Sequence, residues 1–557
     1  YMKDVQKYFS FVKWTPAQIK LKAEKALAEK KKVYEKIAQL PQSKQNFESV
    51  ILAIESIETN YNDIVYPMDV LKNLSPDKKV RTATKKMIDF VNEKSIQIIY
   101  NKKVYLAIKY VFEHHQPKSD ADKKLLDEYY TSYKRMGFDL APKDFKRVKD
   151  IKNLISKYSS DFIKRMNDWN ISMWVTLEEL EGLSEDYVDS LEKKNSKYKI
   201  TLQYPHLLPF LAQAKNVKKR KELADLSAEK GGKENLVLME KTIELRKELA
   251  VLLGYSNFTD YQIERRMARD HKTVMNLQNN LLKKIAPRAK KDLEILTKYK
   301  KKHLGDNSPV LYYESAYLIE EYKKEHFALD SKVVREYFEL NHVLKTLFSI
   351  VKKVFGINLS VVKMPVWNED VFVLEAKVGK NIIGYIAVDL FPREGKYSHA
   401  MAMQICDGRN ENNIRVAPVC ALVCNFAKPT KESPSIISHS DVETLFHEFG
   451  HTIHFISACQ PYALLGGFNV SWDFVEVPSQ FFQQWVWDRD VLKILGKHSK
   501  TKKVIPDDII DKIFTAKKFL AGNFIAGQII LGIFDQNIHT KNIKSFTLHS
   551  KMLRKKY

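Results

Sequence analysis

DVETLFHEFGHTIHF, residues 441–455, is the stretch of this chain that decides its fold and its chemistry. It places His447, Glu448 and His451 in the pattern His-Glu-x-x-His. On an α-helix, residues four apart lie on nearly the same face, so both imidazoles can point at one metal ion. Glu448 lies about 100° further round, where its carboxylate can reach a water in an open coordination position. The pattern predicts zinc-assisted hydrolysis with Glu448 as the general base.

The residues around the motif predict a helix with one buried face. Ser440 and Glu443 form Ser-x-x-Glu, a capping box that would start the helix just before the motif. Apolar residues then recur at helical spacing, at Val442, Leu445, Phe446, Phe449 and Ile453. An isolated histidine pair beside such a stripe is more often structural. The cap and the Glu in second position favour a metal site here.

A catalytic zinc ion needs a third protein ligand. The metzincin extension of the motif would place Gly at 454 and His at 457, whereas this chain has His454 and Ser457. That extension is excluded. The segment FVEVPSQFFQQWVWD instead offers Glu476, 25 residues after His451. A helix, a break at Gly466-Gly467 and a second helix fit this spacing.

Other residues near the motif compete for the same roles. On spacing alone, His454, Asp473 and Asp441 are alternative third ligands. Asp473 and Glu443 are also candidates to accept a hydrogen bond from a ligating histidine and so to orient its ring.

Three segments together resemble one known family of enzymes. They are IIGYIAVDLFPREGKYSHA (382–400), DVETLFHEFGHTIHFI (441–456) and DFVEVPSQFFQQWVW (473–487). These are similar to the thimet oligopeptidase and oligopeptidase A family of zinc metallopeptidases. The ordered match runs from about residue 250 to 557.

The resemblance implies His447, His451 and Glu476 as ligands of one zinc ion, and Glu448 as the catalytic base. It also implies a mainly α, two-lobed body with a deep central channel and a small β-sheet next to the zinc helix. Such a channel admits short unstructured peptides and excludes folded proteins. The implied activity is cleavage of internal peptide bonds, with removal of C-terminal dipeptides by the same chemistry as the alternative.

The sequence departs from the family pattern near its C-terminus. Downstream of the segment matched by KFLAGNFIAGQIILGIFDQ (518–536), the family carries a Gly- and Tyr-rich loop with a His that is thought to stabilise the oxyanion. This chain ends at Tyr557, before such a loop. Losing one oxyanion donor typically costs about 10²–10³ in kcat. We therefore expect an incomplete enzyme, with a zinc-containing peptide-binding fragment of little turnover as a second interpretation.

The local pattern divides the chain at Gly356. Residues 1–355 read as a helical region forming much of both channel walls, and residues 356–557 as the catalytic region. VFVLEAKV and IIGYIAVDL flank Gly379-Lys380-Asn381 and predict a β-hairpin, with further strands at 401–406 and 414–426. An edge of this sheet, around Tyr397 to Met403 according to the resemblance, could bind a peptide as an added strand.

Composition constrains partners and location. The net charge of +24 permits affinity for nucleic acid, but the basic residues are mostly lysines spread along helices, without aromatic-interleaved RNA-binding motifs. The longest apolar run, near FIAGQIILGIF, is about half of a bilayer span. Four cysteines without CxxC spacing predict reduced thiols. We expect a cytoplasmic protein, most simply a monomer, that acts on short peptides and binds neither nucleic acid nor membrane.

Overall fold

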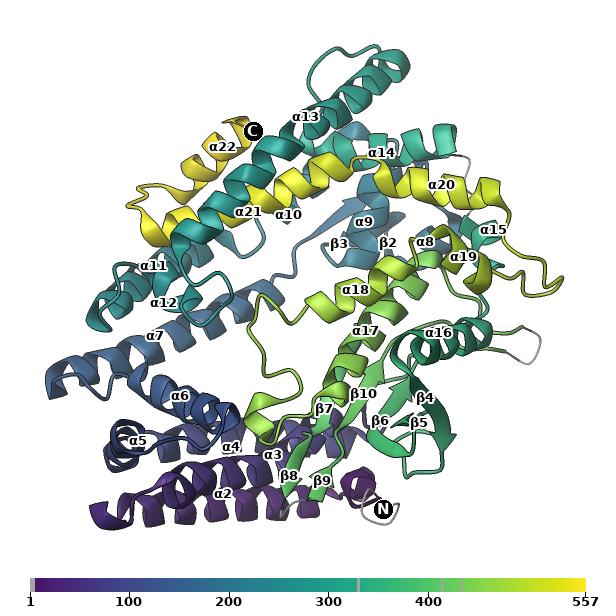
Figure 1. Cartoon of the computed structure of the whole chain (residues 1–557). Helices are drawn as coiled ribbons and strands as arrows, with labels where there is room; N and C mark the ends of the chain where they lie inside the picture. Colours follow the sequence, from purple (N-terminus) through teal and green to yellow (C-terminus); the bar gives the residue numbers. More distant parts are fainter. Residues whose placement is uncertain (1–5, 328–330, 412–413, 431–432, 557) are drawn as a thin grey trace. The chain divides into compact units, whose positions relative to one another are not determined.

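The computed structural model describes residues 6–327, 331–411, 414–430 and 433–556, most of them helical (Figure 1). Contacts within the chain define two compact units. The first is made of Tyr1–Asp139 and Ser331–Ile510, and the second of Leu140–Asp330 and Asp511–Tyr557. The mainly α fold class is confirmed. The sequence-based division into residues 1–355 and 356–557 marks a change in local sequence pattern. The two units described here are instead groups of segments that contact one another.

The first unit begins with helices whose starts are fixed by capping side chains. In α2 (Pro16–Ala38), the Thr15 hydroxyl accepts a hydrogen bond from the backbone N–H of Gln18, and Pro16 occupies the first helical position. The other helical segments of this unit are η1 (Lys7–Lys13), η2 (Gln42–Lys44), η3 (Phe47–Leu52), α3 (Ala53–Leu74), α4 (Lys78–Ile99), α5 (Lys102–His114), α6 (Asp120–Lys134), α15 (Ser331–Arg335), α16 (Leu340–Phe355), α17 (His439–Ser457), η5 (Ala463–Leu465), α18 (Val477–Trp485) and α19 (Arg489–Leu495).

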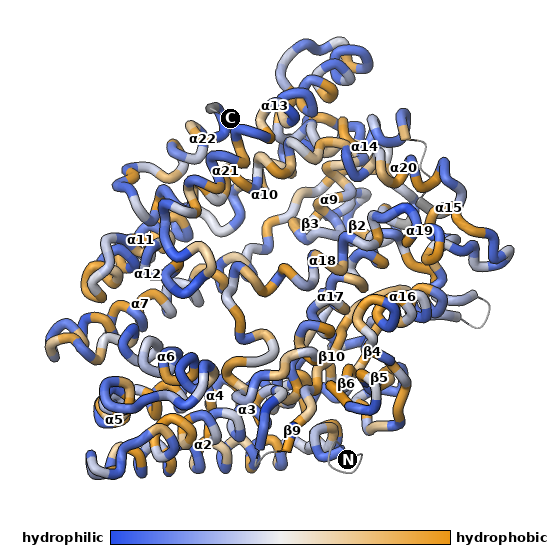
Figure 2. Tube along the Cα trace, viewed as in Figure 1, coloured by the Kyte–Doolittle hydropathy of each residue, from blue (hydrophilic) through white to orange (hydrophobic). Residues whose placement is uncertain are grey.

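A five-stranded sheet in this unit has the order β4-β5-β6-β10-β7. The predicted hairpin is present, because β5 and β6 pair antiparallel, and β6 and β10 pair parallel beside it. Hydrophobic residues dominate β6 and β10 (Figure 2). The strands are β4 (Ile357–Val362), β5 (Phe372–Val378), β6 (Asn381–Asp389), β7 (Met401–Cys406) and β10 (Val419–Val423), and a separate ribbon consists of β8 (Arg409–Glu411) and β9 (Ile414–Val416). β7 is therefore an edge strand.

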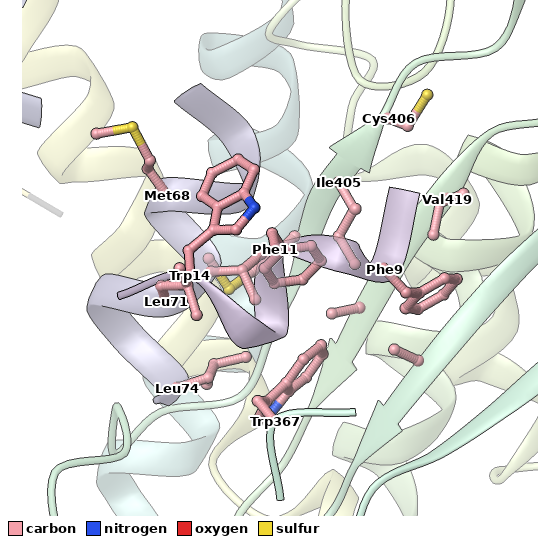
Figure 3. Close-up of a cluster of buried hydrophobic side chains, with 14 of the residues drawn as sticks. Phe9, Phe11, Trp14, Met68, Leu71, Leu74, Trp367, Ile405, Cys406 and Val419 are labelled. Atoms are coloured by element: carbon pink, nitrogen blue, oxygen red, sulfur yellow. The ribbon is translucent and has the colours of Figure 1, made fainter. Parts of the chain in front are cut away.

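The two faces of this sheet are covered by different parts of the chain. On one face, side chains such as Ile405 and Val419 pack with Phe9, Phe11 and Leu71 from the N-terminal segment and α3 (Figure 3). On the other face lies α17, which contacts β6, β7 and β10. The sheet is thus fixed from both sides, and the helix that carries the His-Glu-x-x-His motif rests on its centre.

α17 approaches β6 closely because Gly384 has no side chain. A Cβ at this position would lie 2.6 Å from Cβ of Ile456. A side chain at 384 would therefore separate the sheet from the C-terminal end of the motif helix.

The second unit corrects one sequence prediction. The residues before about 350 read as helical throughout, yet β1 (Ser172–Val175), β3 (Lys197–Thr201) and β2 (Lys193–Lys194) form a three-stranded antiparallel sheet. These strands are too short to show a period of their own in lysine-rich surroundings. Their buried residues, including Met173, Val175 and Ile200, form a small core with Leu207 and Phe210.

The rest of the second unit is helical, with α13 and α21 packed along each other through Leu282, Ala289, Ala526 and Ile533. Its helical segments are α7 (Pro142–Asn167), η4 (Glu178–Leu180), α8 (Glu185–Asp189), α9 (Tyr204–Gln213), α10 (Val217–Ala228), α11 (Gly232–Leu252), α12 (Phe258–Ile263), α13 (His271–Leu304), α14 (Tyr312–Phe327), α21 (Ala521–Thr540) and α22 (Phe546–Lys556).

One described segment, Asp507–Thr540, is long and apolar enough to cross a membrane by length and composition alone. It consists of α20 (Asp507–Lys518) and α21, which are separated at Leu520, where the backbone is left-handed with φ of 56°. The core helix of a soluble protein passes the same test. Because α21 packs on α13, core packing accounts for part of its apolar character.

Candidate metal centre

The motif helix α17 begins two residues earlier than the sequence predicts. Its N-cap is Ser438, whose hydroxyl accepts from the backbone N–H of Asp441, while the Asp441 carboxylate accepts from the backbone N–H of Ser438. This reciprocal pair is the capping box, so the prediction of Ser440 with Glu443 is wrong. The shift places Glu443 inside the helix, where its side chain is available for another contact.

His447, His451 and Glu476 lie together, although Glu476 comes from a different helix. One ligand atom from each of the three side chains lies within 4.8 Å of the other two. Oε2 of Glu476 is 3.3 Å from Nε2 of His447 and 3.2 Å from Nε2 of His451. Two imidazole nitrogens and one carboxylate oxygen make a donor set that suits zinc and leaves a fourth position open.

Glu476 reaches the histidines because α17 and α18 pack in close contact. Gly450, inside the motif, faces the first turn of α18, where Pro478 and Ser479 lie. Glu476 is the N-cap residue of α18, and the Ser479 hydroxyl donates to its Oε2 at 2.7 Å. The start of one helix thus presents a carboxylate, already held by a buried serine, to the side of the other.

The other candidate ligands lie outside this group. In the described part of the chain, His, Cys, Asp and Glu side chains form one such group, and it contains neither His454 nor Asp473 nor Asp441. Asp441 caps α17 instead. Burial lowers the pKa of His454, which favours its neutral form.

Glu448 is buried between α17 and the edge strand β7. The residue is only 8% exposed, and the backbone N–H of Ala402 favours its charged form. Burial raises the pKa of Glu448 to about 7, with His447 lowering it and Glu476 raising it. A carboxyl group with a pKa near neutrality can both accept and release a proton.

The start of β7 is held by a buried ion cluster. Asp389, at the end of β6, accepts hydrogen bonds from Trp367 Nε1, from the Arg393 guanidinium and from Lys396 Nζ. Lys396 also donates to the backbone carbonyl oxygen of Cys424, which follows β10. These bonds fasten the loop between β6 and β7 to the sheet and so position the edge strand beside Glu448.

Sequence reasoning missed the immediate neighbour of His447. Nδ1 of His447 lies 3.0 Å from Oε1 of Gln483 in α18, and Nε2 of Gln483 donates to Glu443 at 2.7 Å. Trp487 Nε1 donates to the same Glu443 oxygen at 2.8 Å. Glu443 was a candidate to contact a ligating histidine directly, but the amide of Gln483 lies between them. The available signal was spacing, since Gln483 follows Glu476 by two helical turns.

Comparison with known proteins gives consistent matches over most of the chain. The family model of peptidase family M3 matches residues 210–557. Saccharolysin of Saccharomyces cerevisiae is 30% identical over 532 residues, covering 90% of this chain and 74% of the yeast protein. The thimet-like oligopeptidase of Dictyostelium discoideum is 29% identical, covering 90% and 78%, and oligopeptidase A of Haemophilus influenzae is 29% identical, covering 91% and 77%. The chain belongs to peptidase family M3.

Proposed function

We propose that this chain is a zinc-dependent oligopeptidase that cleaves internal bonds of short, unstructured peptides. In this proposal His447, His451 and Glu476 hold one zinc ion, and Glu448 is the general base. The observation that carries it is the convergence of three donor atoms from two helices within 4.8 Å, with a buried carboxylate next to His447 in the sequence. The family and the names of its oligopeptidase relatives support the same substrate class.

The donor set fits zinc. Imidazole nitrogen and carboxylate oxygen are ordinary zinc ligands, and a site with three protein ligands is typical of catalysis. When bound, zinc supplies a Lewis acid that polarises the scissile carbonyl group and acidifies a water molecule. His447, His451 and Glu476 would hold it, with the Ser479 hydroxyl fixing the Glu476 carboxylate.

Glu448 would move the proton. Its carboxylate accepts a proton from the attacking water and then delivers it to the nitrogen of the leaving amine. A raised pKa suits this cycle, because a strongly acidic carboxyl group would be a poor base. Burial beside the backbone N–H of Ala402 keeps the group in one place during both transfers.

The edge strand β7 offers a way to hold a peptide without reading its side chains. β7 ends the five-stranded sheet, and its Ala402 contacts Glu448. An extended peptide paired with this edge would place its backbone beside the proposed base. This supports a substrate that is short and unfolded, because a folded protein would have to release a strand first.

We also propose that the protein acts as a monomer in the cytoplasm. Three of its four cysteines are buried, and all four are free, as is common in reducing compartments. The proposal includes no nucleic-acid or membrane partner.

The test is hydrolysis of a quenched fluorescent peptide of about ten residues by the whole chain, with its zinc content measured in parallel. We expect cleavage that a chelator abolishes and added zinc restores. Glu448→Gln should keep about one zinc per chain and lose cleavage, because the amide cannot accept the proton. Mass spectrometry of the products separates internal cleavage from stepwise release of C-terminal dipeptides.

Two outcomes would overturn the proposal. Cleavage that survives both the chelator and Glu448→Gln would rule out the metal-assisted mechanism. Zinc binding and peptide binding without cleavage would instead identify a peptide-binding protein, the second interpretation drawn from the sequence.

A further inference from the structure

The orientation of the Gln483 side-chain amide is fixed by two neighbours. The oxygen of a carboxylate can only accept, so the Gln483 atom 2.7 Å from Glu443 Oε1 is the donating NH₂ group. The indole Nε1 of Trp487 can only donate, and it meets the same Glu443 oxygen at 2.8 Å. The amide oxygen of Gln483 therefore faces His447.

This orientation fixes the tautomer of His447. An amide oxygen accepts hydrogen bonds, so Nδ1 of His447, 3.0 Å away, must carry the proton. In the neutral imidazole the lone pair is then on Nε2, the atom that lies 3.3 Å from the Glu476 carboxylate. The ring is thus held with Nε2, its proposed metal-binding nitrogen, toward His451 and Glu476.

We propose that Gln483 is a positioning residue for zinc binding, held in place by Glu443 and Trp487, and that it sets the tautomer and ring angle of His447. This inference rests on the proposed function. The negative charge of Glu443 is kept one hydrogen bond away from the imidazole. A carboxylate bonded directly to a ligating histidine makes the imidazole more basic and a stronger ligand. An amide orients the ring with a smaller effect on its basicity.

The contacts with Glu443 and His447 favour an amide over a carboxylate at position 483. Replacing Gln483 by Glu would put two carboxylates at the 2.7 Å separation now occupied by a hydrogen bond. Exchanging both residues, in Glu443→Gln with Gln483→Glu, removes this conflict. The new Glu would accept from His447 and from the new Gln, whose oxygen would accept from Trp487.

Four variants test the inference by zinc affinity, measured in competition with a chelator of known affinity. Gln483→Leu should weaken zinc binding by about 10–100-fold, the usual loss when a ligand-orienting partner is removed. Gln484→Leu, the neighbouring exposed residue of α18, should bind as the wild type does. Gln483→Glu alone should bind more weakly than the exchanged pair, and the exchanged pair at least as tightly as the wild type.

Two further measurements separate positioning from folding. The thermal midpoint of each metal-free protein should differ little between Gln483→Leu and the wild type. The visible absorption spectrum of the Co²⁺-loaded protein should change in Gln483→Leu and not in Gln484→Leu, because it reports the geometry around the ion.

The outcomes distinguish the positioning role of Gln483 from the proposed zinc site itself. Unchanged zinc affinity and an unchanged Co²⁺ spectrum in Gln483→Leu would overturn the positioning role and leave the proposed function standing. If the exchanged pair binds zinc no better than Gln483→Glu alone, the proposal that Glu443 holds Gln483 in place would be overturned. A wild-type chain that binds no zinc would overturn the proposed function and this inference with it.

Discussion

Gly450 of α17 and Ser479 of α18 are in backbone contact. A methyl group added at 450 would lie 2.7 Å from Cα of Ser479 and 2.8 Å from the carbonyl oxygen of Pro478. Both distances are shorter than any real Cβ contact, so the helices would have to separate. The spacing between His447 and Glu476 depends on this contact, because each residue is carried by one of the two helices.

Gly450→Ala should therefore weaken metal binding and lower the thermal midpoint, although alanine favours helices by about 1 kcal/mol over glycine. Zinc affinity and the melting curve of the metal-free chain are the measurements. Gly527→Ala in α21 is the matched control, since nothing lies within 4 Å of a Cβ added there. We expect the control to be neutral or slightly stabilising. Equal behaviour of the two variants would contradict the close-packing argument.

Removing the carboxylate of Glu476 should remove the metal. Glu476→Ala leaves two histidines on one helix, which make a much weaker site than three ligands. We expect less than a tenth of the wild-type zinc content after dialysis against a weak chelator, measured by elemental analysis. Asp473→Ala, three residues earlier, serves as the comparison and should retain zinc. Full zinc in Glu476→Ala would show that another residue is the third ligand.

The buried pair of Asp389 and Lys396 should matter far more for stability than an exposed pair. Both side chains are fully buried, and their charged atoms are 2.8 Å apart. Lys396→Met would leave Asp389 with a weaker set of partners, and breaking a buried pair typically costs about 3–5 kcal/mol. Lys428→Met, which breaks the more exposed bridge to Asp370, should cost less than about 1 kcal/mol. Denaturation followed by circular dichroism compares the two, and similar losses would refute the burial argument.

Asp407, just after β7, should make the first unit less stable as pH rises. Burial raises its pKa to about 7, with Asp63 and Glu55 raising it further and Arg409 lowering it. The unfolded chain has a pKa of about 3.9 for Asp, so between about pH 4 and 7 the folded state binds the extra proton. Stability then falls by up to about 1.4 kcal/mol per pH unit across this window.

Asp407→Asn should abolish this contribution. We expect the thermal midpoint of the wild type to fall relative to that of the variant between pH 5 and pH 7, with little relative change above pH 8. If the thermal midpoints of the two proteins change with pH in the same way, Asp407 has an ordinary pKa.

The sequence could predict the features that depend on local spacing. The faces of His447, Glu448 and His451 follow from helical periodicity, and the β5–β6 hairpin follows from Gly379-Lys380-Asn381 between two β-rich runs. The separation of 25 residues made Glu476 one of several candidates for the third ligand, and the family resemblance singled it out from the others. The helix start was misplaced by two residues because Ser438 and Ser440 both precede acidic residues at capping-box spacing.

Features that depend on contacts between distant segments could not be predicted from the sequence. The hydrogen bond between Gln483 and His447 depends on how α17 and α18 pack. No local sequence pattern around either residue indicates the other as its partner. The three-stranded sheet of the second unit was missed for a related reason, since its strands of two to five residues gain stability only by pairing. Nothing in the local pattern around Ser172–Val175 requires that pairing.

The core that joins the N-terminal segment to the sheet has a consequence for folding during synthesis, because its residues are translated at widely separated times. Phe9, Phe11 and Leu71 are buried against residues as late as Val423, and the whole second unit except its last stretch is encoded in between. At a translation rate of roughly 5–20 residues per second, about 20–80 s pass between the synthesis of these early apolar side chains and that of Val423. During that interval they are a target for chaperones. A ribosome-bound chain halted before residue 357 should bind a chaperone more strongly than one released after residue 510.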